Sequence, residues 1–409
     1  MKTLLSIVTL LTLVLTPCFS QIAGYPDFEI VESIPEHTIL DNPDIRNTQG
    51  VWIQMIEGAQ KSLDFEEFYV CNEPGEQLEA VLRAIFKAAQ RGVRVRFIVD
   101  AGMYKTYPTM VDSLSRQNNI AVRIIDYRKL AGGIQHAKYF TVDGKEVFIG
   151  SQNFDWRALN QIHELGVRIA NKEAVQVFQG AFDLDWKLAL TNSPEAIEKY
   201  LHHTAYPMPI RVIEEPGDTL VYVPTYSPLT LDPDTALWDE SNIVKLIDEA
   251  QHSVMMQFLT YSPLVYRGGY YPVLNDALFR AAKRGVQVKL IVSDWEKSAR
   301  QVEQLKKLAE VPNVEVKFSS IPELQGRYIS YARVEHCKYI VVDSSSCWVG
   351  SSNAEKSYFY NTRNVGVVVW NVRVASLLRR IFLKDWNGPY TEKVEQNGMY
   401  VPREHGERK

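Results

Sequence analysis

Two short stretches of the chain carry a histidine, a lysine, an aspartate, a glycine and an asparagine at identical spacings. The first set is His136, Lys138, Asp143, Gly150 and Asn153. The second set is His336, Lys338, Asp343, Gly350 and Asn353, each displaced by 336 − 136 = 200 residues. A match to five fixed residue types has a chance probability on the order of 10⁻⁶ per starting position. The two copies therefore indicate an internal duplication.

The histidine and lysine of each copy predict a site for a phosphate ester. Because they lie two residues apart on an extended segment, their side chains point to the same face. Two copies around one pocket would supply two imidazoles, two ammonium groups and, from Asn153 and Asn353, two amides. The ammonium and amide groups can neutralise the non-bridging oxygens of a phosphodiester as charge develops. One imidazole can attack phosphorus while the other protonates the leaving oxygen, and the spacing alone leaves open which does which.

A metal site is the alternative for any pair of histidines. The lysine beside each histidine disfavours a bound cation, and no cluster of carboxylates accompanies the pair. We therefore predict no metal and no other cofactor.

The remaining motif residues have structural explanations. Asp143 and Asp343 fall at hairpin turns, where a carboxylate caps backbone N–H groups, so we expect them to hold the turn. Gly150 and Gly350 follow, and the lack of a side chain lets a neighbouring strand approach closely.

Hydrophobic periodicity predicts alternating helices and strands around the first copy. The chain has an amphipathic helix over 76–90, closed by Gly92, and a strand over 93–99. The motif itself is predicted as a hairpin of strands 139–142 and 147–149. The other predicted elements are helices over 52–60, 109–117 and 172–188 and strands over 62–69, 122–125 and 165–169.

The second half repeats this order. Residues 281–292 echo residues 88–99, and the motif hairpin returns over 339–349. Strands that alternate with helices predict α/β repeats with largely parallel or mixed sheets and helices on the outside. We expect the two repeats to pack together, with the active site at their interface.

The composition along the chain predicts four segments. These are a signal peptide over 1–20, a first repeat over 21–190, a connector over 191–240 and a second repeat over 241–409. The connector is rich in proline and threonine. Within the first repeat, residues 22–47 are rich in proline and acidic residues and are predicted to be an irregular lead-in.

The N-terminus is typical of an exported protein. Lys2 precedes an apolar run over 4–15, and a small residue, Ser20, offers a cleavage point. An uncleaved signal anchor is disfavoured because the run is shorter than the roughly 20 residues that span a bilayer. A lipoprotein signal ending at Cys18 is a minor alternative. We therefore expect a secreted, periplasmic or lumenal protein.

Charge and cysteine content exclude two classes. Without the signal peptide the net charge is −4 − 1 = −5, because Lys2 is removed. A generally basic protein that coats duplex nucleic acid is therefore excluded, and phosphate recognition must be local. Cys71, Cys337 and Cys347 remain, an odd number that does not indicate a disulfide framework.

The duplicated pattern H-x-K-x4-D-x6-G-x2-N resembles the signature of the phospholipase D superfamily over nearly all of the mature chain. The surroundings are most similar to its animal lysosomal branch, types three and four, which are 5′ exonucleases of single-stranded nucleic acid. The segments that carry this second resemblance are 31–35, 150–167, 331–336 and 381–390.

The resemblance implies a role for each histidine. His136 would be the nucleophile that forms a phosphohistidine, and His336 would be the general acid and base. An acidic residue after the motif orients a histidine in many members, and Glu164 fits that place in the first copy. Asn364 stands at the equivalent position in the second copy. We therefore expect Glu164 to support His136.

Three functions remain open. The first is a secreted 5′ exonuclease that acts on single-stranded DNA or RNA. The second is a phospholipase D or transphosphatidylase, because the motif recognises only the phosphate and phospholipid head groups carry one too. The third is a binding module without activity, which the two intact motifs disfavour. A homodimer is compatible with each of them.

Overall fold

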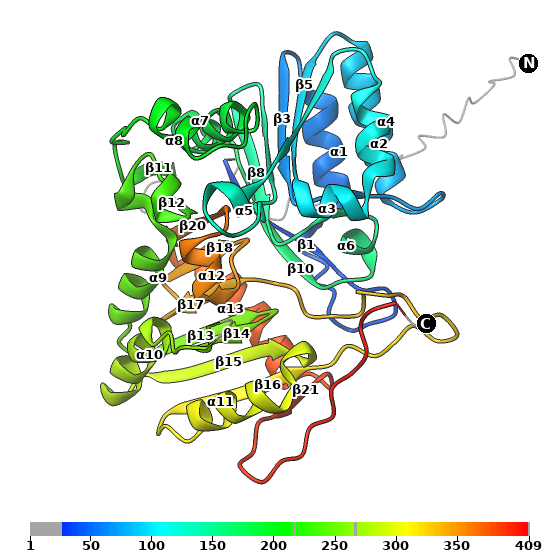
Figure 1. The fold of residues 1–409 in the computed structure, drawn as a ribbon. Coiled ribbons are helices and arrows are strands. Elements are labelled where there is room, and N and C mark those ends of the chain that lie inside the picture. Colours follow the sequence, from blue (N-terminus) through cyan, green and yellow to red (C-terminus); the bar gives the residue numbers. More distant parts are fainter. Residues whose placement is uncertain (1–26, 216–217, 266–267, 408–409) are drawn as a thin grey trace, which may run out of the picture.

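The computed structural model describes residues 27–215, 218–265 and 268–407. The predicted signal peptide, 1–20, lies outside the described residues. The chain folds into two α/β units in tandem, the first drawn in blue to green and the second in green to red (Figure 1). The predicted fold class of two α/β repeats is confirmed.

The first unit is built on an eight-stranded sheet with the order β2-β1-β10-β8-β7-β3-β5-β6. The motif hairpin, β7–β8, lies near its centre, and β7 (Tyr139–Val142) is buried along its whole length. A continuous apolar run is typical of such a doubly covered strand. The other strands are β1 (Phe28–Ser33), β2 (Arg46–Asn47), β3 (Ser62–Glu67), β5 (Arg94–Asp100), β6 (Ile120–Ile125), β8 (Glu146–Gly150) and β10 (Glu164–Ile169).

The second unit has a nine-stranded sheet with the order β11-β12-β20-β18-β17-β13-β15-β16-β21. Its motif hairpin, β17–β18, occupies the place of β7–β8 in the first sheet. Its strands are β11 (Ile210–Glu215), β12 (Asp218–Ser227), β13 (Ser253–Phe258), β15 (Gln287–Ser293), β16 (Val314–Ser319), β17 (Tyr339–Val342), β18 (Ser346–Gly350), β20 (Asn364–Trp370) and β21 (Thr391–Lys393). Two-stranded ribbons pair β4 (Val70–Cys71) with β9 (Phe154–Asp155) and β14 (Tyr261–Ser262) with β19 (Ala354–Glu355).

Both sheets are mixed, as expected, but antiparallel pairs predominate over the parallel pairs that we emphasised. Parallel pairing joins β3, β5 and β6 in one sheet and β13, β15 and β16 in the other. The hairpins and their neighbours β10 and β20 are antiparallel. The physical reason is that a tight hairpin joins strands only in antiparallel order.

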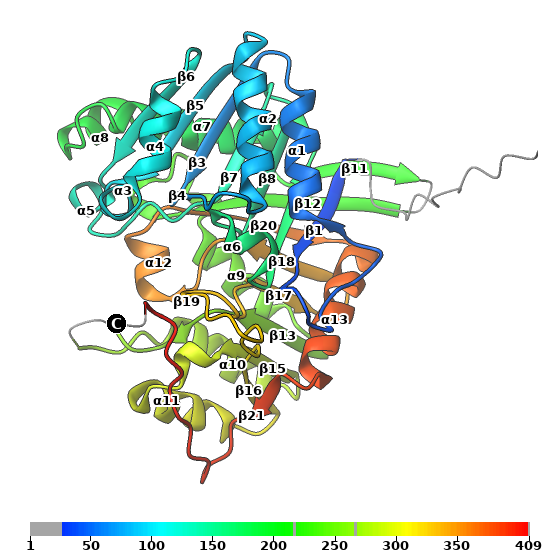
Figure 2. The same cartoon turned by 90° about the vertical axis from the view of Figure 1, so that its right-hand side faces the viewer.

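Helices cover both faces of each sheet. One face of the first sheet packs against α1 (Thr48–Gly58), α2 (Leu78–Gln90) and α4 (Pro108–Ser115). The matching face of the second sheet packs against α9 (Asp239–Asp248), α10 (Val273–Lys283) and α11 (Ala299–Ala309) (Figure 2). The shorter helices are α3 (Ala101–Thr106), α5 (Tyr127–Leu130), α6 (Arg157–Asn160), α8 (Glu195–Tyr200) and α12 (Lys356–Tyr360).

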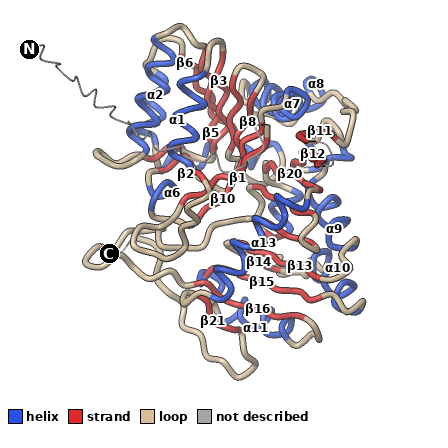
Figure 3. The backbone as a smooth tube through the Cα atoms, turned by 180° about the vertical axis from the view of Figure 1, so that it is seen from behind, coloured by secondary structure: helices blue, strands red, loops and turns tan. Residues whose placement is uncertain are grey.

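A single hydrophobic core joins the two units. It contains buried residues of α7 (Lys172–Leu188) and α13 (Val372–Asn387), together with residues of β8, β10, β18 and β20. The loops of the two units also meet between the sheets, beside the C-terminal end (Figure 3). There the guanidinium of Arg157 donates to the carbonyl of Ser330 at 3.0 Å. Packing of the repeats against each other is confirmed.

The predicted connector and the predicted irregular lead-in both contain strands. The predicted connector, 191–240, includes α8, β11 and β12, and β12 pairs with β20 along its length. The predicted lead-in includes β1, which pairs with β10 in the same way. Each unit thus begins with a strand that precedes its first helix. Pro224 inside β12 and the acidic Glu29 and Glu32 inside β1 concealed these strands, because such residues are depleted from strands.

Two further observations concern membrane-spanning helices and disulfide bonds. No helix within the described residues has the length and hydropathy needed to cross a membrane. Cys71, Cys337 and Cys347 are all free thiols.

Candidate active site

The two motif histidines lie where the two units meet. Each histidine lies three residues before the first residue of its motif strand. The backbone of the opposite unit holds it there. The N–H of His136 donates to the carbonyl of Arg363 at 3.0 Å, and the N–H of His336 donates to the carbonyl of His163 at 3.0 Å. The fold therefore couples the position of each histidine to the other repeat.

The motif side chains are all buried. They are His136, Lys138, Asn153, His336, Lys338 and Asn353. Each ammonium group is tied to its own histidine, because Lys138 Nζ donates to the carbonyl of His136 at 2.7 Å and Lys338 Nζ to that of His336 at 2.6 Å. The amide oxygens of Asn153 and Asn353 have no hydrogen-bond partner among the described residues. Buried polar atoms without partners suit a polar ligand.

The charges show that the two motifs form one electrostatic site. Burial lowers the pKa of His136 well below its usual 6.5, and the positive charges of Lys138 and Lys338 lower it further. Burial and the same two lysines lower the pKa of His336 in the same way. Burial lowers the pKa of Lys338 to about 8, against the opposing effect of Glu164. Both lysines therefore act on both histidines.

Glu164 does not support His136, which corrects our expectation. Its Oε2 lies 2.8 Å from Nδ1 of His336, whereas Nδ1 of His136 lies 2.9 Å from Oδ1 of Asn364. The partners are exchanged between repeats because β10 and β20 each start at the interface and face the opposite motif. Position along the chain cannot show this crossing.

Asn364 fixes the tautomer of His136. Its amide nitrogen donates to the carbonyls of Tyr358 at 2.9 Å and Thr362 at 3.3 Å, which directs Oδ1 toward the histidine. Nδ1 of His136 must then carry the hydrogen, and Nε2 keeps its lone pair. The neutral amide offers no charge to stabilise an imidazolium. Nε2 of His136 is thus free of a proton and can act as an acceptor.

Glu164 gives His336 different properties. Burial raises the pKa of Glu164 well above its usual 4.5, although the charge of Lys338 opposes this. Because the pKa of His336 is lowered while that of Glu164 is raised, the hydrogen-bonded pair retains one buried proton between Oε2 and Nδ1. Such a pair can deliver a proton and take it back. The two histidines are equivalent in sequence but not in chemistry.

Asp143 and Asp343 hold the hairpins, as expected. Asp143 accepts hydrogen bonds from the N–H groups of residues 60, 61 and 62. Asp343 accepts the equivalent bonds from residues 251, 252 and 253. Each carboxylate thus ties the hairpin turn to the strand beside it.

Gly350→Ala is expected to lower the free energy of unfolding by about 1–3 kcal/mol. A Cβ at this position would lie 2.7 Å from the carbonyl oxygen of Val365 in the paired strand β20, which cannot move without disturbing the sheet. Urea unfolding measures the change. Gly50→Ala is the matched control, because a Cβ there meets nothing within 4 Å. Equal stability of the two variants would contradict the close approach.

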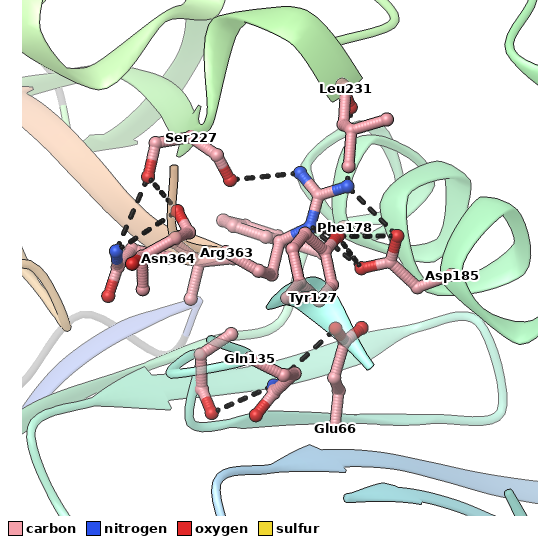
Figure 4. Close-up of polar contacts among 12 residues, drawn as sticks. Glu66, Tyr127, Gln135, Phe178, Asp185, Ser227, Leu231, Arg363 and Asn364 are labelled. Atoms are coloured by element: carbon pink, nitrogen blue, oxygen red, sulfur yellow. Dashed lines mark hydrogen bonds and ion pairs between the residues drawn. The ribbon is translucent and has the colours of Figure 1, made fainter. Parts of the chain in front are cut away.

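The sequence prediction missed several residues of the site. His163 and Arg363 are buried residues whose carbonyls hold the motif histidines, and Arg363 reaches from the second unit into the first (Figure 4). The rings of Phe68 and Tyr358 flank His136, with centroids 5.1 and 5.0 Å from its ring. The 200-residue offset was the available signal for His163 and Arg363, because they immediately precede Glu164 and Asn364.

One cluster of described residues has the side chains of a metal site. His163, Glu335 and Cys337 place their ligand atoms within 4.8 Å of one another. Nδ1 of His163 is already hydrogen-bonded to Oε2 of Glu335 at 2.8 Å. Burial raises the pKa of the Cys337 thiol well above its usual range, which disfavours the thiolate that binds metals. Hydrogen bonding and ion pairing therefore explain the cluster.

Comparison with known families identifies the class of protein. Residues 52–186 and 243–386 each match the family model described as "Cardiolipin synthase, PLD-like domain". The chain therefore belongs to the phospholipase D superfamily. One match falls in each of the two α/β units.

Individual relatives place the chain within the superfamily. It is 31% identical over 404 residues to the 5′-3′ exonuclease PLD3 of Macaca fascicularis, covering 91% of this chain and 81% of the relative. It is 29% identical over 386 residues to phospholipase D Z of Dictyostelium discoideum, covering 90% of both. The fold resembles phosphatidylserine synthase of Haemophilus influenzae, with a TM-score of 0.59, 15% identity and coverage of 84% and 85%. The chain is close to the PLD3 branch, as the resemblance implied.

Proposed function

We propose that the protein is a phosphodiesterase that cleaves single-stranded DNA or RNA from the 5′ end, without a metal, through a phosphohistidine on His136. In this proposal His336 is the general acid and then the general base. Lys138, Lys338, Asn153 and Asn353 bind the non-bridging oxygens of the phosphate.

The unequal partners of the two histidines carry the assignment of roles. A nucleophile needs a free lone pair, and the contact from Nδ1 of His136 to Asn364 leaves Nε2 unprotonated. A general acid needs a proton that it can donate near neutral pH, and the raised pKa of Glu164 lets the hydrogen-bonded pair of Glu164 and His336 retain one, so that Nε2 of His336 carries a hydrogen. Reversing the roles would place the nucleophile beside the carboxylate and the acid beside a neutral amide.

The reaction has two steps that balance. In the first, Nε2 of His136 attacks phosphorus, the bond to the leaving oxygen breaks, and Nε2–H of His336 gives that oxygen its proton. In the second, His336 removes a proton from water, the resulting hydroxide attacks phosphorus, and the bond between phosphorus and His136 breaks. The lysine charges stabilise both transition states.

The similarity to the exonuclease PLD3 over most of the chain supports nucleic acid as the substrate. A phospholipid is the second candidate, favoured by the similarity to phospholipase D Z. Both substrates are phosphodiesters, so the same residues would serve either reaction.

A direct assay separates the two. Purified protein receives 5′-hydroxyl single-stranded DNA, radiolabelled in the base of its first nucleotide, and phosphatidylcholine vesicles in parallel, with and without EDTA. We expect release of 3′-phosphorylated mononucleotides, equal in both conditions. Release of choline with intact DNA at every pH from 4 to 8 would replace the proposal with its lipid alternative, and loss of activity in EDTA would restore a metal site.

The pH dependence of kcat/KM is expected to be bell-shaped, with its acid limb below pH 6.5. Burial and the lysine charges lower the pKa of His136, so the nucleophile stays unprotonated in mildly acidic solution. Above about pH 8 Lys338 loses its proton and the site loses a charge that binds phosphate. Rates measured from pH 4 to 9 test this. An acid limb above pH 6.5 would contradict it.

Asn364→Asp provides the matched variant. A carboxylate beside His136 raises the pKa of that imidazole, so the acid limb should move to higher pH. Glu164→Gln changes the partner of His336 and not that of His136, so it should leave the acid limb in place.

A further inference from the structure

His163 and Arg363 are equivalent residues of the two repeats, because 363 − 163 = 200. We propose that His163, as a cation held by Glu335 and Asp385, is the positioning residue for His336, as Arg363 is for His136. The inference rests on the proposed roles of the two histidines and adds the groups that hold them in place.

Arg363 shows what such an anchor does. Its guanidinium forms two hydrogen bonds with Asp185, at 2.7 and 2.9 Å, and donates to the Tyr127 hydroxyl at 2.7 Å. It also donates to the carbonyls of Ser227 and Leu231, and the side chain is fully buried (Figure 4). The carbonyl of the same residue accepts the N–H of His136, and the next residue is Asn364. One anchored residue therefore fixes both hydrogen bonds of His136.

His163 repeats this arrangement with different chemistry. Nδ1 of His163 lies 2.8 Å from Oε2 of Glu335 and 3.8 Å from Oδ2 of Asp385. Its N–H donates to the carbonyl of Val334 at 3.1 Å, and its carbonyl accepts the N–H of His336 at 3.0 Å. The next residue, Glu164, holds Nδ1 of His336. Both hydrogen bonds of His336 therefore depend on the backbone at His163.

The surroundings of His163 favour a positive charge. Glu335 precedes the second motif, Asp385 belongs to α13 and Glu32 to β1, and all three carboxyl groups are buried. Burial opposes protonation of His163, but the charges of Glu335 and Asp385, with a smaller contribution from Glu32, raise its pKa to about 10. The stability from this charge is complete below about pH 6.5 and is lost only as the pH rises through about 10. Across the working range His163 is thus a cation like Arg363.

His163→Gln removes the charge while keeping a polar side chain of similar length. Two phosphodiesters of thymidine 3′-phosphate report the effect: the dinucleotide, whose leaving alcohol needs a proton, and the p-nitrophenyl ester, whose leaving phenolate does not. Because a misplaced His336 delivers its proton poorly, we expect the first-turnover rate on the dinucleotide to fall by about 10–100-fold. The p-nitrophenolate burst should fall far less. Equal losses on both substrates would overturn the proposal.

Arg363→Lys is the matched control on the other histidine. It acts through the nucleophile, so both substrates should slow by the same factor. His163→Arg restores the charge with the residue of the first anchor and should recover part of the rate on the dinucleotide. A folded His163→Arg variant that is no faster than His163→Gln would show that the charge is not needed.

A second variant and an NMR measurement test the proposal if His163→Gln does not fold or if its rates alone do not decide. Glu335→Gln introduces the residue found at the equivalent position, Gln135, and should give the same leaving-group pattern if His163→Gln fails to fold. The NMR signal of the proton between His336 and Glu164 should shift in His163→Gln while that of His136 does not, and an unchanged signal would also overturn the proposal. If wild-type protein leaves oligonucleotides intact, the proposed substrate is wrong, but the positioning role of His163 can still be tested. The rates on the p-nitrophenyl ester and on phosphatidylcholine are then compared in place of the two thymidine substrates.

Discussion

Replacing either motif histidine with alanine is expected to lower kcat by at least about 10⁴-fold, with the protein still folded. His136→Ala removes the only group that the proposal assigns to attack phosphorus. His336→Ala leaves the nucleophile but removes the proton donor and the base for the second step. Because the two act as one unit, the double variant should be little slower than either single variant. Single-turnover rates on 5′-hydroxyl single-stranded DNA measure all three.

The two single variants should differ with an activated substrate. His336→Ala should still release p-nitrophenolate in a burst, since that leaving group needs no proton, whereas His136→Ala should release none. His203→Ala is the control, because this histidine is exposed and belongs to neither motif. Circular dichroism and thermal unfolding confirm the fold of each variant. Retained turnover in either motif variant would remove that histidine from the mechanism.

Asp185→Ala is expected to lower the free energy of unfolding by roughly 3–5 kcal/mol. Asp185 is the counter-ion of Arg363, and both side chains are fully buried at the interface of the units. Removal of the carboxylate leaves a guanidinium in the core that cannot lose its proton, because charge and hydrogen bonding to Asp185 keep the pKa of Arg363 well above its usual value against the effect of burial. Urea unfolding of the two proteins measures the difference.

Asp44→Ala provides the comparison at the surface. Asp44 pairs with Arg380, and both side chains are partly exposed, so water replaces the lost contact. The expected cost is at most about 1 kcal/mol. Similar costs for Asp185→Ala and Asp44→Ala would show that the buried pair does not hold the two units together.

The repeat and its motifs could be predicted from the sequence because they depend on local spacing. The histidine and lysine share a strand face, Asp143 caps the turn, and Gly150 permits close approach, and each of these follows from residue type and periodicity. The amphipathic helix of α2 was also accessible, since its buried residues recur at helical spacing and Gly92 follows with a positive φ of 93°. These are the parts that hydrophobic pattern and backbone chemistry decide.

The contacts across the interface could not be predicted in the same way. Glu164 follows the first motif in sequence but contacts His336 of the second, because the choice depends on how the repeats pack. Arg363 offers no local signal that its partner is Asp185, since no periodicity links a strand of one unit to a helix of the other. Pro224 is a central-strand residue that local propensity argues against, and tertiary pairing overrides it.

The central claim is that the two equivalent histidines have different roles, and one measurement tests it most directly. DNA labelled at the first internucleotide phosphate is mixed with excess enzyme and quenched in base, which preserves a bond between phosphorus and nitrogen, and the labelled peptide is then sequenced. The account predicts label on the peptide that contains His136. When His336→Ala receives the p-nitrophenyl ester labelled at phosphorus, more label should accumulate on this peptide, because the variant lacks the base for the second step. Label on the peptide that contains His336, or no labelled peptide at any time before product forms, would contradict it.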